Sequence, residues 1–224
     1  MKKSFVVFSL IAVSALIVFL IMGHTSDRDP TPTKENPTQQ EPLAEAYFSG
    51  GCFWCVEAIY ESVKGVKEAI SGYSGGTTEN PTYEMVGAGA TDHAETVQVL
   101  YDPSIISFKQ LVEVFFGSHD PTSLNRQGPD TGTQYRSIAF YSNLEEKKII
   151  TDYMDSLTKQ KIYDQPIVTE VLPVGLFYKA EEYHQNYEEN NPYNPYIRFV
   201  SQPRLNRFKE NFNELLKEDN EDQP

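Results

Sequence analysis

Cysteine is scarce in this chain of 224 residues, where Cys52 and Cys55 are the only two. They share residues 50–57 with the only tryptophan, Trp54. A closed zinc site needs four ligands, and the four histidines show no paired spacing, which argues against a metal centre. A disulfide between residues so close together would remove little chain entropy, so a redox use of the pair is favoured over a structural one.

Positive charge is also in short supply, since 19 lysines and arginines face 32 aspartates and glutamates, for a net charge of -13. Binding to phosphates needs basic clusters, and here the basic residues are scattered, so we expect no nucleic-acid partner. The acidic residues in 213–224 predict a solvated tail. Gly87-Ala88-Gly89 lacks the third glycine of a dinucleotide motif, and we expect no cofactor.

Long apolar stretches are limited to residues 5–22, which carry no charge and follow Lys2 and Lys3. This run exceeds a signal-peptide core and is borderline for a membrane span, so residues 1–23 are expected to be a membrane anchor or signal sequence, with an uncleaved transmembrane helix preferred. Positive-inside bias then places the rest of the chain outside the cytoplasm, or secreted if the segment is cleaved. Residues 24–43 predict a Pro-rich polar tether, and 44–212 a single, monomeric domain.

The apolar pattern of residues 44–212 mixes strands with helices. It predicts strands at 46–49, 66–73, 94–101, 135–141 and 167–172, and helices at 52–63, 107–117, 144–157 and 203–216. Ser107 with Gln110, and Asn143 with Glu146, have the spacing of helix caps. The order of elements predicts an α+β two-layer sandwich, although the pattern alone leaves a doubly wound sheet open.

The most informative stretch that is present begins at Gly50 and Gly51. A short apolar strand precedes it and helical spacing follows it, so Cys52 is expected at the start of a helix. Unpaired backbone N–H groups and the helix dipole favour a thiolate there. Cys55, three residues on, would share a helix face with Cys52 and could capture it as a disulfide after reaction. The alternative is a pair of buried, inert cysteines.

Glu95 follows His93 at the start of a predicted strand whose alternation puts one face in the core. A carboxyl that is partly desolvated there would have a raised pKa and could act as a general acid. The alternative is an ordinary surface glutamate. Tyr83 and Tyr135 could donate phenolic hydrogen bonds, but the chain holds 14 tyrosines, so pattern alone would not single them out.

Several separate motifs, in the same order along the chain, resemble the peptide methionine sulfoxide reductases of the A type. The resemblance covers about residues 47–196 and rests on Gly51-Cys52-Phe53-Trp54, Gly75-Gly76, Asn80-Pro81-Thr82-Tyr83, Asp92-His93-Ala94-Glu95, Tyr101-Asp102-Pro103, His119-Asp120-Pro121, Arg126-Gln127-Gly128, Asp130 and Gly132-Thr133-Gln134-Tyr135-Arg136-Ser137. It implies a two-layer sandwich related to the ferredoxin-like plait. It also implies reduction of the S epimer of methionine sulfoxide, in proteins and as the free amino acid.

The resemblance also implies roles for individual residues. The nucleophile would be Cys52, which becomes a sulfenic acid, with Glu95 as the proton donor. Phe53 and Trp54 would line the pocket for the methyl group. The sulfoxide oxygen would be held by Tyr83, Glu95 and Tyr135. Asp130 would help to position the substrate. No cysteine follows Cys55, so Cys55 is the one internal candidate for resolution, with a thioredoxin-like reductant recycling the enzyme. An external thiol acting directly on the sulfenic acid is the alternative.

Two rival functions fit parts of the sequence. Cys52-Phe53-Trp54-Cys55 also resembles the motif of a general dithiol-disulfide oxidoreductase, which would need neither Glu95 nor the tyrosines. The proline- and tyrosine-rich residues 191–196 suggest an anchored binding module, although a packed loop is the preferred interpretation.

Overall fold

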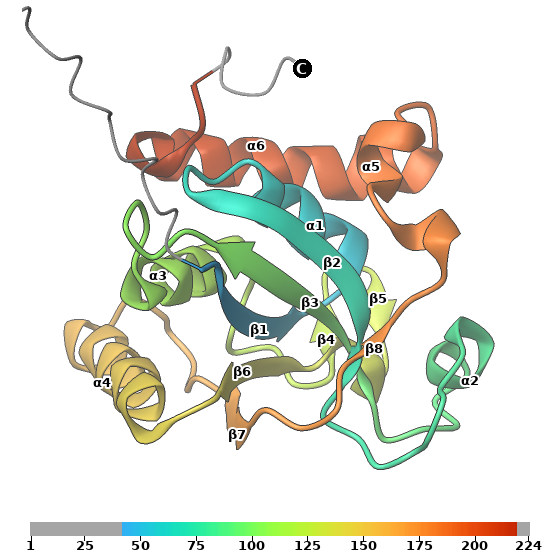
Figure 1. The fold of residues 1–224 in the computed structure, drawn as a ribbon, viewed down its shortest axis with the longest axis horizontal. Helices are drawn as coiled ribbons and strands as arrows, with labels where there is room; N and C mark the ends of the chain where they lie inside the picture. The colour runs from blue at the N-terminus through green and yellow to red at the C-terminus, as the bar shows by residue number, and fades with distance from the viewer. Residues whose placement is uncertain (1–41, 219–224) are drawn as a thin grey trace, which may run out of the picture. The chain divides into compact units, whose positions relative to one another are not determined.

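A six-stranded sheet organises the computed structural model, which describes residues 42–218 (Figure 1). The strands lie in the order β7-β6-β1-β3-β2-β8. Their bounds are β1 (Ala44–Gly50), β2 (Val66–Ser74), β3 (Ala94–Tyr101), β6 (Ser137–Tyr141), β7 (Glu170–Pro173) and β8 (Tyr178–Lys179). Neighbouring strands are antiparallel except β6 and β7, which are parallel, so the sheet is mixed.

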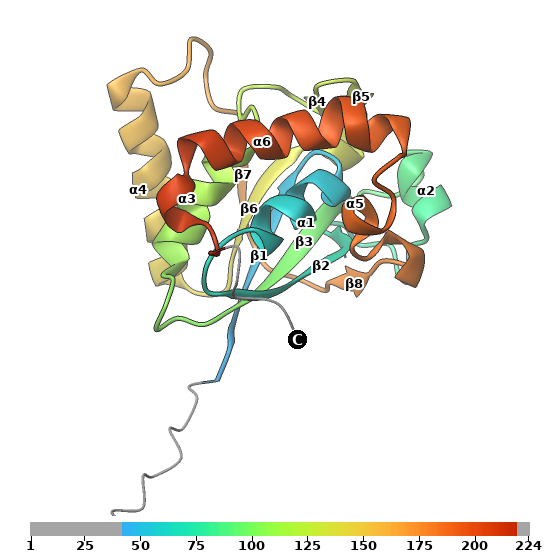
Figure 2. The ribbon, with the colours of Figure 1, turned by 90° about the horizontal axis from the view of Figure 1, so that it is seen from above.

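Three helices pack on this sheet: α1 (Phe53–Glu61) on β2 and β3, α3 (Phe108–Ser118) on β1, and α4 (Leu144–Gln160) on β6 and β7. The last long helix, α6 (Gln202–Asn211), lies across α1 and α3 and follows a π-helical turn, Ile197–Ser201 (Figure 2). The remaining elements are short: α2 (Tyr83–Gly87), α5 (Tyr187–Asn190), the hairpin strands β4 (Arg126–Gln127) and β5 (Asp130–Thr131), and 3-10 turns at Thr133–Tyr135, Glu182–His184 and Asn213–Leu215.

Local sequence accounts for the starts of two helices. Ser107 and Gln110 form the predicted capping box, in which the Gln110 N–H donates to the Ser107 hydroxyl and the Ser107 N–H donates to the Gln110 side chain. The Asn143 side chain accepts from the Glu146 N–H at 2.9 Å, as predicted for α4. These caps satisfy N–H groups that have no partner within the helix.

The main core lies between the sheet and its helices, and aromatic rings fill its centre. Phe48 of β1 stacks on Tyr60 of α1 and on Phe115 of α3, with ring centroids 5.3 and 5.1 Å apart. Val97 and Val99 of β3 are fully buried on the same side. Because this packing fixes α1 against β3, it also fixes the positions of the side chains at the start of α1.

The predicted fold class, a two-layer sandwich related to the ferredoxin-like plait with an N-terminal transmembrane helix, is wrong as stated. The sheet is mixed, with a parallel edge strand β7 and a second edge strand β8 of two residues. Within residues 42–218, no helix combines the length and the apolar composition needed to cross a bilayer. The predicted anchor (1–23), most of the tether (24–43) and the end of the acidic tail lie outside the described residues.

Gly72 marks the tightest approach between β2 and the edge strand β8. A Cβ atom at this position would lie 2.5 Å from the carbonyl oxygen of Tyr178 and 2.3 Å from the ring of Phe177. We predict that Gly72→Ala lowers the free energy of unfolding by about 1–3 kcal/mol, because backbone must move to admit the methyl group. Urea denaturation would measure the loss.

Gly87→Ala is the matched control, since nothing lies within 4 Å of a Cβ atom at Gly87. This variant is expected to unfold within about 0.5 kcal/mol of the parent. Equal stability of the two variants would contradict the packing of β8 against β2.

Candidate active site

Cys52 occupies the N-cap position of α1, directly after the turn that ends β1. Gly51 makes the turn possible, because it has a φ of +94 and a Cβ atom there would lie 2.6 Å from Cβ of Gln127. The side chain of Cys52 makes no capping hydrogen bond and is 6% exposed. The sulfur is therefore held at the start of a helix, as the sequence predicted.

Glu95 of β3 supplies the hydrogen bond that caps α1. Its Oε2 atom accepts from the backbone N–H of Phe53 at 2.9 Å, and the residue is 2% exposed. Burial raises the pKa of Glu95 to about 8, although the bond from Phe53 acts in the opposite direction. The predicted surface alternative is thus wrong, and near neutral pH this carboxyl is protonated and able to donate.

The two thiols are electrostatically coupled to each other. Burial raises the pKa of Cys52, and the neighbouring Cys55 and Glu95 raise it further. A hydrogen bond with the Cys52 thiol lowers the pKa of Cys55, and the Arg204 guanidinium lowers it further. Burial thus opposes the thiolate that the helix start favours on Cys52, while the neighbouring groups favour a thiolate on Cys55.

Trp54 is held by three aromatic residues from the C-terminal part of the chain. Its indole N–H donates to Nδ1 of His184 at 3.0 Å. Its ring stacks on Tyr187 with centroids 3.8 Å apart, and the ring of Tyr196 lies edge-on at 5.9 Å. Phe53 is 1% exposed and packs against His184 at 5.0 Å, so it lies beneath this aromatic group.

Tyr83 and Tyr135 approach the reactive groups from two loops. Tyr83 begins α2, and its backbone N–H donates to Glu181 at 3.0 Å. Burial raises the pKa of Tyr83 to about 12 and also raises that of Tyr135, and the charges of Glu95 and Cys52 add to both shifts. Both hydroxyls consequently keep their hydrogens and can donate them near Cys52.

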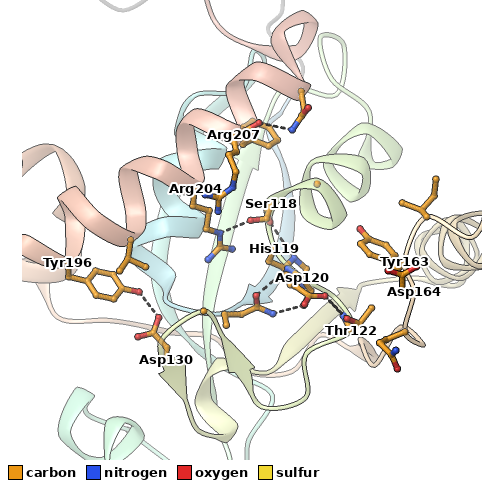
Figure 3. A pocket seen from close by; sticks show the side chains of 18 residues that line it. Ser118, His119, Asp120, Thr122, Asp130, Tyr163, Asp164, Tyr196, Arg204 and Arg207 are labelled. Carbon is orange, nitrogen blue, oxygen red and sulfur yellow. Dashed lines mark hydrogen bonds between the residues drawn. The ribbon is translucent and has the colours of Figure 1, made fainter.

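Asp130 of β5 is joined to the site through Tyr196. The hydroxyl of Tyr196 donates to Oδ2 of Asp130 at 2.5 Å and lies 3.8 Å from the sulfur of Cys55 (Figure 3). Asp130, Tyr196 and Arg204 also line a neighbouring cavity of about 790 Å³. The structure thus brings all eight predicted site residues to one end of α1, with Asp130 at its edge.

Four residues of the site were missed by the sequence analysis: His184, Tyr187, Tyr196 and Arg204. Tyr196 belongs to the Tyr- and Pro-rich stretch that was interpreted as a packed loop. The other three carry no motif, because they reach the site through tertiary packing. Among residues 42–218, no group of three His, Cys, Asp or Glu side chains could hold a metal ion.

This arrangement defines a class of protein before any comparison is made. A pair of buried, electrostatically coupled thiols beside a buried, protonated carboxyl group is suited to thiol-based reduction of a polar group that must gain a proton. The fold and the site together therefore define a cysteine-dependent oxidoreductase.

Comparisons with known proteins agree. The family model for peptide methionine sulfoxide reductase matches residues 44–216. The chain is 50% identical over 173 residues to the peptide methionine sulfoxide reductase MsrA of Natronomonas pharaonis, covering 77% of this chain and 97% of the relative. It is 48% identical over 173 residues to that of Pasteurella multocida, covering 77% of this chain and 98% of the relative.

Solved structures give the same result. Mxr1 from Saccharomyces cerevisiae in reduced form has a TM-score of 0.64 and 34% identity, over 71% of this chain and 92% of that one. Methionine sulfoxide reductase A of Corynebacterium diphtheriae has a TM-score of 0.61 and 35% identity, over 75% of this chain and 85% of that one. The chain belongs to the peptide methionine sulfoxide reductase family, which confirms the family expected from the sequence motifs.

The buried carboxyl group predicts a specific dependence of stability on pH. Glu95 has an ordinary pKa of 4.5 and a raised value of about 8 in the folded protein, so folding favours its protonated form. Its contribution is fully present below pH 4.5 and is lost as pH rises through about 8. Between pH 5 and 9 the parent should lose on the order of 4 kcal/mol of its free energy of unfolding through Glu95. We predict that Glu95→Gln, whose side chain stays neutral, does not show this loss.

Urea unfolding of the parent and Glu95→Gln at pH 5, 7 and 9 would measure this effect. The variant should gain stability relative to the parent as pH rises. A difference between the two proteins that is the same at all three values would show that Glu95 titrates normally.

Proposed function

We propose that Cys52 is the nucleophile of a methionine sulfoxide reductase and Glu95 its proton donor. The observation that carries the proposal is the bond from the Phe53 N–H to Glu95, which places a protonated carboxyl group at the start of the helix that holds Cys52. The enzyme reduces methionine sulfoxide to methionine, in proteins and as the free amino acid, and so repairs oxidised proteins. Family membership supports this reaction.

Protonation of Glu95 favours the reacting thiolate as well as the leaving oxygen. A carboxylate at Glu95 would raise the pKa of Cys52, and its protonated form does not. A thiolate on Cys55 can take the proton of the neighbouring Cys52 thiol. The negative charge is then on the Cys52 sulfur. Cys52 then attacks the sulfoxide sulfur while Glu95 protonates the oxygen.

The first step ends with methionine and a sulfenic acid on Cys52. The oxygen moves from the substrate to the Cys52 sulfur, so the methionine sulfur gains two electrons and the cysteine sulfur loses two. Tyr83 and Tyr135 would donate to the oxygen as negative charge develops on it. Each of these donors keeps its hydrogen because its pKa is raised.

Recognition of the methyl group falls to Phe53 and Trp54. Trp54 is fixed by His184 and Tyr187, and such a rigid apolar wall suits an S-methyl group. If the methyl group contacts this wall and the oxygen accepts from the hydroxyl donors, only one of the two epimers of the substrate sulfur leaves that sulfur open to attack by Cys52. The proposed arrangement accepts the S epimer, and Asp130 would position the rest of the substrate.

Cys55 would resolve the sulfenic acid. Its contact with Cys52 in the reduced protein supports this role, since a disulfide needs the two sulfurs to approach along the same face of α1. A thioredoxin-like dithiol would then reduce the Cys52–Cys55 disulfide and complete the cycle. A general dithiol oxidoreductase has the same cysteine spacing, but disulfide exchange alone gives no reason to bury a protonated Glu95 beside them.

The two cysteines can be told apart in a single turnover. We predict that one equivalent of Cys55→Ser releases about one methionine from the S epimer, because Cys52 and Glu95 are intact, but fails to cycle with thioredoxin. Cys52→Ser should release none, since a hydroxyl is a far weaker nucleophile than a thiolate. The yield of methionine, measured by chromatography with both epimers, is the readout.

Mass spectrometry of the same samples follows the enzyme. The parent should carry a Cys52–Cys55 disulfide, and Cys55→Ser a sulfenic acid that dimedone can trap. Methionine release by Cys52→Ser would overturn the assignment of the nucleophile. Cycling of Cys55→Ser with thioredoxin at the parental rate would leave resolution to an external thiol.

A further inference from the structure

Arg204 is the cationic side chain that α6 places beside the two cysteines. Its Nε atom donates to the carbonyl oxygen of Ser118 at 2.5 Å, and Nη2 donates to that of Gly50 at 2.8 Å. These carbonyls belong to the last residue of α3 and the last residue of β1. Figure 3 shows the Arg204 side chain extending from α6 toward Ser118. These two hydrogen bonds to backbone fix the guanidinium group at Gly50, which lies two positions before Cys52 in the sequence.

The charge of this guanidinium is not cancelled by a direct ion pair within residues 42–218, because both of its hydrogen bonds go to carbonyl oxygens. It contributes to the lowered pKa of Cys55, and it opposes the rise that burial causes in the pKa of Asp130. A fixed cation without a bonded carboxylate exerts more of its field on neighbouring acids than a paired one.

The Arg204 guanidinium lowers the pKa of Cys55 more than the hydroxyls of Ser201 and Tyr196 do, and those hydroxyls are engaged with other partners. Around it lie Cys52 from the start of α1, Glu95 from β3, Tyr196 and Ser201 from the segment before α6, and Arg204. The one hydroxyl hydrogen of Tyr196 is donated to Asp130, and that of Ser201 is donated to Glu188. Once Glu95 has given its proton to the sulfoxide oxygen, its carboxylate opposes a second negative charge nearby.

The S–H hydrogen of Cys52 is available to the Cys55 thiolate only while Cys52 is reduced. Once Cys52 has become a sulfenic acid, its sulfur no longer carries the hydrogen that bonds to Cys55. We propose that Arg204 is a positioning residue for resolution, whose fixed charge beside Cys55 stabilises the thiolate that attacks the Cys52 sulfenic acid. This role rests on the proposed function of Cys55 as the resolving thiol.

The step balances without a further reactant. The Cys55 thiolate forms a bond to the Cys52 sulfur, the S–O bond of the sulfenic acid breaks, and the departing hydroxide leaves as water after taking one proton from solvent. The Cys55 sulfur supplies the electron pair of the new S–S bond, and the departing oxygen takes the electron pair of the broken S–O bond. Arg204 remains unchanged and bonded to Gly50 and Ser118.

A titration tests the charge effect without catalysis. In a Cys52→Ser background Cys55 is the only cysteine, so the ultraviolet absorbance of its thiolate follows one ionisation. Arg204→Gln should raise the midpoint by about one pH unit, and Arg204→Lys, which keeps the charge, by clearly less. Arg204→Met is a second neutral variant with a long aliphatic stem, for use if the glutamine variant does not fold.

Arg207→Gln is the matched control, because Arg207 is an exposed arginine one turn further along α6. It should leave the midpoint where it is. An unchanged midpoint in the neutral Arg204 variants, or an equal rise in the lysine variant, would overturn the proposal and leave Arg204 as a backbone clamp.

Single-turnover kinetics with both cysteines present tests the same role in the reaction. At pH 7, Arg204→Gln should slow disulfide formation by about fivefold to tenfold more than it slows methionine release, and the gap should close at high pH as Cys55 ionises unaided. A purely structural role would slow both steps at every pH. Absence of methionine release from the parent enzyme would instead refute the proposed function, while the titration would still decide whether Arg204 stabilises the Cys55 thiolate.

Discussion

The hydrogen bond from the Phe53 N–H to Glu95 joins the two halves of the site. The first N–H groups of a helix have no partner within it, and Cys52 provides no side-chain cap for α1. The carboxyl group of Glu95, from β3, accepts the hydrogen bond of the Phe53 N–H instead. Because the bond ends on a buried residue, any shift of α1 against β3 would leave a polar group without a partner. One contact therefore keeps the nucleophile and the acid together, and the packing of Phe48 against α1 and α3 supports it.

The same burial that orients Glu95 also keeps it neutral, and that neutrality governs the chemistry around it. The thiols of Cys52 and Cys55 and the carboxyl group of Asp130 are three further acidic groups near Glu95. If they were ionised together, their negative charges would repel one another. The site limits this repulsion by keeping a proton on Glu95, and the Arg204 cation lowers the pKa of Cys55. The proton that the sulfoxide oxygen needs is thereby stored beside the nucleophile.

Local patterns in the sequence were sufficient for Cys52 at a helix start and for Glu95 at a strand start, because each depends on residues within a few positions. Tyr196 and Arg204 were missed because tertiary packing brings them to α1 from about 150 residues away. The two-residue strand β8 is too short to show any alternation, and the parallel pairing of β6 with β7 depends on tertiary packing that the alternation within each strand does not reveal. The start of a helix favours a thiolate on Cys52, but the burial of Cys52 acts in the opposite direction and depends on packing that a local pattern does not show. The proposed chemical roles, and the location outside the cytoplasm, stay predictions.

The most direct test of this account is the rate of methionine release in a single turnover, followed from pH 5 to 10 in the parent and in Glu95→Gln. If a protonated Glu95 is the acid, the parental rate should fall above about pH 8 along one ionisation. The variant should lack that fall and be slower by about 10²–10⁴ below it, because an amide cannot give up the proton. A variant that matched the parent in rate, or a decline above pH 8 that persisted without the carboxyl group, would contradict the account.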